Sequence, residues 1–226
     1  RRLYGALARD VGVATARRAH TYLNAAYSQA VAHEELPRNP CQNVRPPKPP
    51  RQVEREFGMD DIARMIAAAE ASPKLRAAGF PAMIWAAATI GARRGELCGL
   101  QWDDIGRNGI VTIRRSVVQV GPELVVKPPK SGKSRKVKVD GVTLAVLERW
   151  RAYSDRMFTL AGASMGADWY VWGGEEPTRP DVVTRRWDRL KERGGTSMRF
   201  HDIRHANATL IAALGFDPAD GARRLG

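Results

Sequence analysis

Apolar residues recur at spacings of three and four over most of this 226-residue chain, a pattern typical of amphipathic helices. The first stretch covers residues 15–35, with Thr15 as the expected N-cap. Another helix is expected to begin at Asp60 or Asp61, with these residues on its buried face: Ile62, Met65, Ile66 and Ala69.

Helical spacing returns at intervals through the rest of the chain. Pro81 suits the first turn of a helix that Gly91 is expected to end, and Arg93 then falls at a junction between two helices. Asp217, followed by a proline, is expected to cap the last helix. Three longer helices are predicted in between, near residues 144–157, 180–193 and 199–214.

The pattern changes to short β-branched runs in the middle of the chain, separated by glycine and proline. These runs are residues 110–113, 116–120, 124–126 and 136–139. They predict one small antiparallel sheet of three strands with a basic turn. The expected fold class is therefore mainly α with a small antiparallel β-sheet (α+β).

Prolines crowd residues 37–56, where neither a helix nor a central strand is expected to continue. This stretch is predicted to be an extended linker. The expected domains are a partial helical domain over 1–36, the linker over 37–56, and a larger domain over 57–226.

The charge balance adds a prediction about partners. The chain has 37 Lys and Arg residues against 24 Asp and Glu, a formal net charge of +13. A surplus of this size favours a polyanion such as nucleic acid, although a basic protein without such a partner is the alternative. Cys41 and Cys98 lie far apart and form neither a disulfide framework nor a zinc pattern, which fits a reducing compartment. No apolar run approaches ~18 residues, so no membrane-spanning helix is expected.

Four cationic residues are the candidates for chemistry on a phosphate: Arg93, Lys130, His201 and Arg204. Arginine offers a planar fork of N–H donors that matches phosphate oxygens, whereas lysine and histidine can also move protons. His201 and Arg204 are three residues apart and share one helix face. Arg93 and Arg94 leave a helix about 100° apart, so they do not both face one phosphate.

Each candidate has a plainer interpretation. Arg93 and Glu96 could form only a surface ion pair, worth under ~1 kcal/mol. Gly132 allows a tight turn around Lys130, and that turn could serve only to hold a phosphate backbone by its charge. Lys133, on the same turn, is the alternative to Lys130. A metal site at His201 and Asp202 is disfavoured, because the other ligands that a metal would need are missing.

Three segments together resemble the catalytic domain of the tyrosine recombinases, the phage-integrase family, from about Asp60 to the last residue. Gly91-Ala92-Arg93-Arg94-Gly95-Glu96-Leu97, followed by Gly99-Leu100-Gln101-Trp102, is similar to the family's first arginine box. His201-Asp202-Ile203-Arg204-His205 is similar to the second. Arg223-Arg224-Leu225-Gly226 resembles the start of a third.

The resemblance implies a site-specific, integrase-like DNA recombinase that cleaves and rejoins DNA strands. A tyrosine would attack a DNA phosphate and form a 3′-phosphotyrosine, with no metal, ATP or other cofactor. Arg93, Lys130, His201 and Arg204 would be catalytic, and Glu96 would orient Arg93. The residues expected to contact DNA are Arg94, Lys133, Arg135, Lys136 and His205. The expected partners are double-stranded DNA attachment sites, on which four copies would assemble, and the expected location is a bacterial cytoplasm with no membrane contact.

The family's nucleophilic tyrosine has no match in this chain. None of the five tyrosines follows the second box, so no nucleophile is assigned and the chain by itself is expected to be inactive. Residues 1–36 resemble only the last part of the helical core-binding domain that precedes the catalytic domain in the family. A DNA-binding protein without chemistry and an enzyme similar to type IB topoisomerases are the alternatives.

Overall fold

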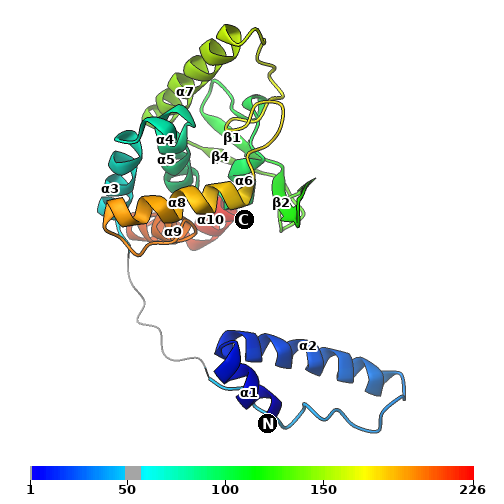
Figure 1. Cartoon of the computed structure of the whole chain (residues 1–226). Helices are drawn as coiled ribbons and strands as arrows, with labels where there is room; N and C mark the ends of the chain where they lie inside the picture. The colour runs from blue at the N-terminus through cyan, green and yellow to red at the C-terminus, as the bar shows by residue number, and fades with distance from the viewer. Residues whose placement is uncertain (1, 49–56) are drawn as a thin grey trace. The chain divides into compact units, whose positions relative to one another are not determined.

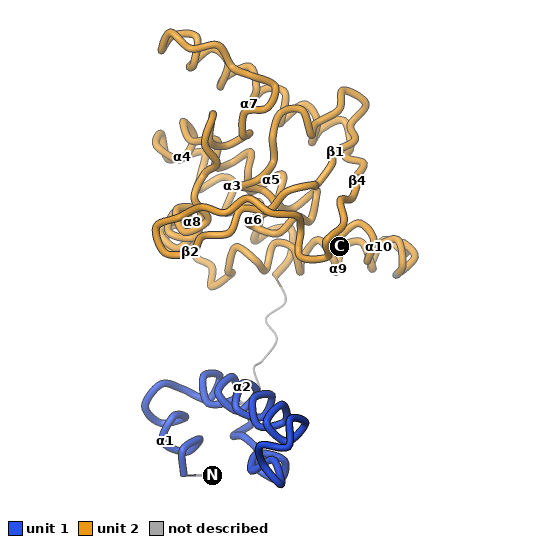
Figure 2. The backbone as a smooth tube through the Cα atoms, turned by 90° about the vertical axis from the view of Figure 1, so that its right-hand side faces the viewer, with its two compact units in different colours: residues 1–55 blue, residues 56–226 orange. Residues whose placement is uncertain are grey.

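The computed structural model describes residues 2–48 and 57–226, which fall in two compact units, Arg1–Arg55 and Glu56–Gly226 (Figure 2). The predicted linker includes residues 49–56, which lie outside the described residues. Each unit is described by itself below.

The first unit is a pair of packed helices, α1 (Arg2–Asp10) and α2 (Val13–Ala32). The predicted start at Thr15 is wrong, because α2 already begins after Gly12. The φ of Gly12 is 95°, a non-helical value that separates α1 from α2. Tyr4 is buried, with its hydroxyl 3.1 Å from His20 Nδ1. Packing of α1 against α2 explains a boundary that the periodicity alone did not reveal.

The second unit is built around α5 (Phe80–Ile90), an apolar helix that is buried on almost every side. A helix that is apolar all round belongs in the centre of a core. It contacts α3, α4, α6, α7 and α9 (Figure 1). The helices of this unit besides α5 are α3 (Met59–Glu70), α4 (Pro73–Ala77), α6 (Arg94–Cys98), α7 (Gly141–Leu160), α8 (Pro180–Gly194), α9 (Asp202–Ala213) and α10 (Pro218–Leu225), with a 3₁₀ turn at Trp102–Asp104.

Several local predictions are confirmed in this unit. Ile62, Met65 and Ala69 are buried on α3. Gly91 ends α5 in the left-handed conformation, at φ 69°, which a glycine adopts without the steric cost of a Cβ. Asp217 caps α10, since its side chain accepts a hydrogen bond of 2.6 Å from the Ala219 N–H.

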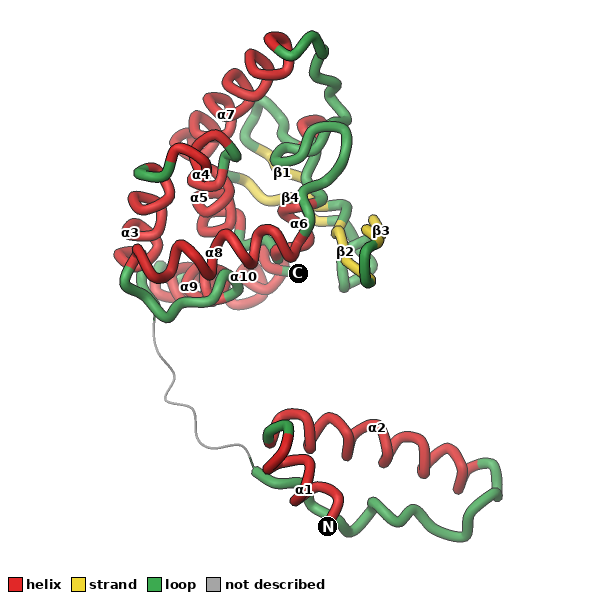
Figure 3. The backbone as a smooth tube through the Cα atoms, in the orientation of Figure 1, coloured by secondary structure: helices red, strands yellow, loops and turns green. Residues whose placement is uncertain are grey.

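In the described part of the chain, four short strands form two antiparallel pairs, not the single three-stranded sheet that was predicted (Figure 3). One pair joins β1 (Ile110–Ile113) to β4 (Arg135–Lys138), and the other joins β2 (Ser116–Val120) to β3 (Glu123–Lys127). The fold class is nevertheless confirmed, because the chain is mostly helical with a small antiparallel β component.

Burial explains why the strands pair in this way. Val111 and Ile113 of β1 and Val137 of β4 are buried in the core, whereas β3 contributes no buried residue. Core contacts therefore select β4 as the partner of β1, and β3 forms a projecting hairpin with β2. The basic turn joins β3 to β4, which belong to different pairs.

Candidate functional site

Arg93 lies at the start of α6, where its backbone and its side chain share one acceptor. Its main-chain N–H donates to Glu96 Oε2 over 2.8 Å, and Nη1 donates to Glu96 Oε1 over 3.0 Å. Glu96 therefore accepts one hydrogen bond from the Arg93 main chain and one from its guanidinium. The remaining fork nitrogen, Nη2, donates to the main-chain carbonyl oxygen of Gly226 over 2.5 Å.

Arg204 reaches the same oxygen from the first turn of α9. Its Nη2 donates to the Gly226 carbonyl over 3.2 Å, while Nη1 donates to the carbonyl of Gly91 over 2.6 Å. Helix α5 packs against α9, and the hydrogen bond from Arg204 to Gly91 at the end of α5 brings the two arginine boxes together. Two guanidinium groups from distant parts of the chain thus point at one oxygen.

Burial and the neighbouring Arg93 charge lower the pKa of Arg204 to about 10. The group still carries its charge at neutral pH, because that value lies well above 7. A concentration of unbalanced positive charge at a partly covered position is what an anion-binding site requires.

Arg135 differs from the expectation that it contacts DNA from the basic turn. Its side chain is only 8% exposed, because it forms a two-pronged ion pair with Glu96: Nη1 to Oε1 at 3.1 Å and Nη2 to Oε2 at 2.7 Å. Arg135, Val137 and Val139 are spaced two residues apart, so they lie on the same face of the strand. Val137 and Val139 are buried, and this spacing therefore indicates that Arg135 also faces inward. That signal was missed because the lysine-rich surroundings suggested a solvated turn.

Glu96 is the buried centre of this group, with no exposed side-chain surface. Burial alone would raise the pKa of its carboxyl, but the hydrogen bonds from Arg135 and Arg93 outweigh that effect and hold the pKa below its ordinary value of 4.5. Glu96 is therefore ionised at neutral pH and balances part of the positive charge of the three arginines. We call Arg93, Glu96, Arg135 and Arg204 the arginine cluster.

His201 lies just before α9, three residues before Arg204, and is exposed to solvent. Partial loss of hydration, with the nearby charges of His205 and Arg204, lowers the pKa of His201 below its ordinary value of 6.5. The rings of His201 and His205 meet edge to face, with their centroids 5.0 Å apart. A mainly neutral His201 at pH 7 is able to accept a proton.

A groove of about 1090 Å³ runs from these residues between β2 and α8. Its lining includes Arg93, Arg94 and His201, together with two arginines that the sequence interpretation did not single out, Arg185 and Arg199. Arg94 reaches across to the Thr184 hydroxyl of α8. The arginines of the lining outnumber its two acidic residues, Asp181 and Asp188, although Arg185 is paired with Asp181 and Arg199 with Asp202.

The basic turn stays separate from the arginine cluster. Lys130, Lys133 and Lys136 are exposed, and within the described residues their amines form no hydrogen bond or ion pair. Gly132 closes the turn at φ 72°, and its N–H donates to the Pro129 carbonyl over 2.8 Å. The structure therefore brings together the predicted arginines, Glu96 and His201, and leaves the predicted lysine on an exposed loop.

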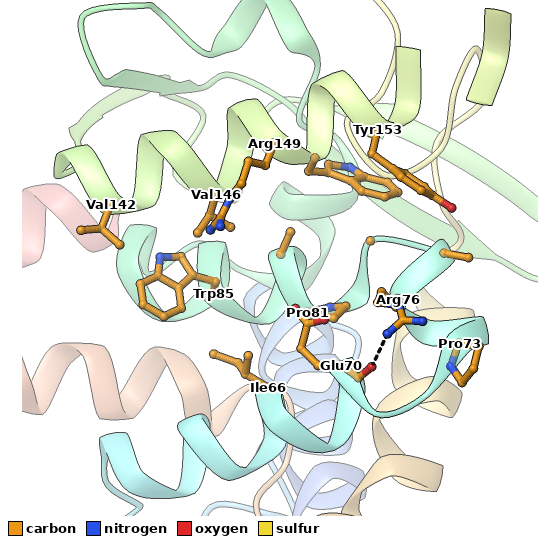
Figure 4. Close-up of a pocket in the computed structure, with 14 residues that line it drawn as sticks. Ile66, Glu70, Pro73, Arg76, Pro81, Trp85, Val142, Val146, Arg149 and Tyr153 are labelled. Atoms are coloured by element: carbon orange, nitrogen blue, oxygen red, sulfur yellow. Dashed lines mark hydrogen bonds between the residues drawn. The ribbon is translucent and has the colours of Figure 1, made fainter. Parts of the chain in front are cut away.

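An apolar pocket of about 650 Å³ lies elsewhere, between α7 and the helices α3, α4 and α5 (Figure 4). The indole rings of Trp85 and Trp150 form part of its walls, each held by an N–H bond, to Thr143 Oγ1 and the Val171 carbonyl respectively. None of the predicted site residues lines this pocket. The arginine cluster and its groove are the better candidate for phosphate chemistry.

Residues 2–48 and 57–226 contain neither a candidate metal site nor a candidate membrane-spanning helix. No three His, Cys, Asp or Glu side chains gather there in a set that could hold a metal ion. No helix of those residues is both long and apolar enough to cross a membrane.

An α+β unit with two converging arginine boxes beside a basic groove defines the class of protein, and comparison with known families agrees. Residues 56–226 match the model of the phage integrase family, and the chain belongs to that family.

Among curated proteins, the ICEBs1 integrase of Bacillus subtilis is 29% identical over 210 residues, which span 91% of this chain and 56% of that protein. The putative prophage phiRv2 integrase of Mycobacterium tuberculosis is 28% identical, and the match spans 100% of this chain and 58% of that protein. The chain therefore spans a little over half the length of these relatives.

Solved structures of integrases share the fold. A lambda integrase tetramer bound to a Holliday junction matches with a TM-score of 0.70 at 19% identity, over 98% of this chain and 61% of that one. A Tn1549 transposon integrase in complex with transposon right-end DNA matches with a TM-score of 0.78 at 14% identity, over 99% of this chain and 75% of that one.

Proposed function

We propose that the protein containing this chain is a site-specific DNA recombinase that cleaves and rejoins DNA strands through a 3′-phosphotyrosine intermediate. The observation that carries the proposal is the convergence of Arg93 and Arg204 on one carbonyl oxygen. Two guanidinium forks that share an oxygen acceptor suit the non-bridging oxygens of a phosphate diester. The integrase relatives, some of them solved with DNA, support the same substrate.

Charge stabilisation would be the main contribution of this chain to catalysis. When an oxygen nucleophile attacks the phosphorus, negative charge grows on the non-bridging oxygens, where Arg93 and Arg204 would donate. His201, neutral at pH 7, would either hydrogen-bond the phosphate or accept the proton of the nucleophile. Lys130 would protonate the leaving 5′ oxygen, which requires the exposed turn to reach the bound DNA.

The proposed reaction exchanges one phosphoester bond for another, so it requires no external energy source. The tyrosine oxygen forms a bond to phosphorus as the bond to the 5′ oxygen breaks, and a 5′-hydroxyl from the partner strand later reverses the exchange. The charged side chains of Arg93, Arg204 and Lys130 would supply the charge stabilisation for which other phosphoryl-transfer enzymes use a metal ion. The tyrosine itself is not assigned among the five of this chain.

Double-stranded attachment sites and four copies of the protein would form the working assembly. The groove beside Arg94, Arg185 and Arg199 would follow the phosphate backbone next to the cleaved position. Such contacts make the affinity for DNA fall as salt rises, by ~0.9 log unit per log unit of salt for each neutralised phosphate.

The test uses the complete protein and a random-sequence pool of nicked DNA duplexes, in which a cleaved strand is trapped on the protein. We expect a denaturation-resistant protein–DNA adduct that releases a phosphotyrosine on digestion, and that forms equally well with a metal chelator present. Binding without an adduct would instead support the DNA-binding alternative. Relaxation of supercoiled DNA without strand exchange would support the topoisomerase-like alternative.

A further inference from the structure

The arginine cluster contains one residue that the proposed chemistry does not use. Arg135 does not face the groove, and none of its guanidinium nitrogens is directed at the Gly226 oxygen that Arg93 and Arg204 share. All three of its nitrogens are occupied within the protein: two by Glu96, and Nε by the carbonyl of Arg224 over 2.9 Å. Its role is therefore to hold other groups in place.

Arg135 joins three segments that are far apart in the sequence. It stands on β4, its fork holds Glu96 of α6, and its Nε holds the last turn of α10. Arg224 returns the contact, because its own guanidinium donates to the carbonyls of Lys138, on β4, and Thr89, on α5. These hydrogen bonds hold the end of α10 next to the first arginine box.

We infer that Arg135 is a positioning residue for the proposed strand cleavage, because it holds Glu96 so that the Arg93 guanidinium points at the position of the phosphate. Glu96 has two carboxylate oxygens, and each of them accepts one bond from Arg93 and one from Arg135. Removal of Arg135 would leave Glu96 free to turn towards Arg93 alone. The guanidinium of Arg93 would then shift out of line with Arg204.

The same contact controls the charge of Glu96. The charged groups that face the Glu96 carboxylate are Arg93 on its own helix, Arg135 on β4 and Arg204 on α9. Burial opposes ionisation of Glu96, and Arg135 provides the largest opposing contribution. Without Arg135 the pKa of Glu96 would rise, because the largest contribution that favours its ionised form would be lost.

The inference depends on the proposed function, and a matched control separates the positioning role from simple loss of stability. Arg115 also binds a buried carboxylate, that of Asp104, over 2.8 Å, and a main-chain carbonyl, that of Gly99, over 3.4 Å, but it does not line the groove. The variants are Arg135→Gln and Arg115→Gln in the complete protein. Three quantities are measured for each: urea unfolding, binding to the nicked duplex selected with the unaltered protein, and the single-turnover rate of adduct formation.

We expect both variants to lose stability and to bind the duplex within a few-fold of the unaltered protein. Arg135→Gln should form the adduct about 100-fold more slowly, the scale expected when a reacting group is misplaced by about 1 Å, whereas Arg115→Gln should stay within a few-fold. Arg135→Lys, which retains one charged contact to Glu96, should recover part of the rate. An Arg135→Gln rate no slower than that of Arg115→Gln would overturn the inference. If Arg135→Gln does not fold, Arg135→Lys and Arg115→Lys are compared by the same criterion.

A titration without DNA keeps this inference separate from the proposed function. The carboxyl carbon of Glu96 is followed by NMR as the pH is changed. We expect its titration midpoint to move upward in the Arg135 variant and to stay unchanged in the Arg115 variant. An unmoved midpoint would overturn the inference even if the unaltered protein forms no adduct, whereas absence of the adduct alone counts against the proposed recombinase.

Discussion

Replacement of Arg204 by lysine tests whether the shape of a guanidinium matters, or only its charge. The Arg204 fork spans two acceptors, the carbonyls of Gly91 and Gly226, at 2.6 and 3.2 Å. A lysine ammonium is a compact point charge on a flexible stem and does not reproduce this two-sided contact. The variant keeps the positive charge near the phosphate and loses one directed donor.

The size of the effect follows from that one donor. A preorganised donor to the developing negative charge contributes ~2.7–4 kcal/mol to lowering the barrier, which corresponds to a rate loss of about 10²–10³. Binding of the uncleaved DNA should change only a few-fold, because Coulomb attraction to the phosphate depends on the charge. The burial that lowers the pKa of Arg204 to about 10 also lowers the pKa of a lysine at this position, so binding is compared at pH 7 or below.

The assay measures adduct formation and duplex binding for Arg204→Lys and for a control with the same substitution at Arg223. Arg223 is on α10, its side chain is 77% exposed, and among the described residues it forms an ion pair only with Asp220. We expect the control to cleave at the unaltered rate. The reasoning is refuted if Arg204→Lys binds normally and cleaves within about ten-fold of the unaltered protein, since a single directed donor would then contribute less than the magnitude above.

Three more variants give further tests. Glu96→Gln should lower the free energy of unfolding by ~3–5 kcal/mol in urea titrations, because it leaves the buried Arg135 guanidinium without its counter-charge. The folded-state pKa of Glu96 lies below 4.5, so its stabilisation is complete above that pH and is lost as the pH falls towards the folded value; the Gln variant should lack this acid-dependent loss. If His201 accepts a proton, single-turnover cleavage should slow as the pH falls below 6.5 and His201 becomes charged, and His201→Gln should show no such slope. If Lys133 neutralises one phosphate, Lys133→Gln should reduce the slope of log affinity against log salt by ~0.9, and an unchanged slope would exclude that contact.

Local sequence signals determined the helical elements and several of their ends. Pro81, Gly91 and Asp217 each act through their own backbone or a neighbouring N–H, so their effect does not depend on distant parts of the chain. The resemblance of the arginine boxes to a known family was likewise readable from contiguous residues, and the family match over residues 56–226 confirms it.

Only the tertiary structure decided which strands pair and where Arg135 points. Local pattern marks a strand but does not choose its partner; burial of Val111, Ile113 and Val137 makes that choice. The sequence predicts that Arg135 belongs to an exposed basic turn. In the structure it forms an ion pair with the buried carboxylate of Glu96, which is distant in the sequence, and its side chain is largely buried. Likewise, the meeting of Arg93 and Arg204 depends on α5 packing against α9, a contact between segments that no short-range periodicity records.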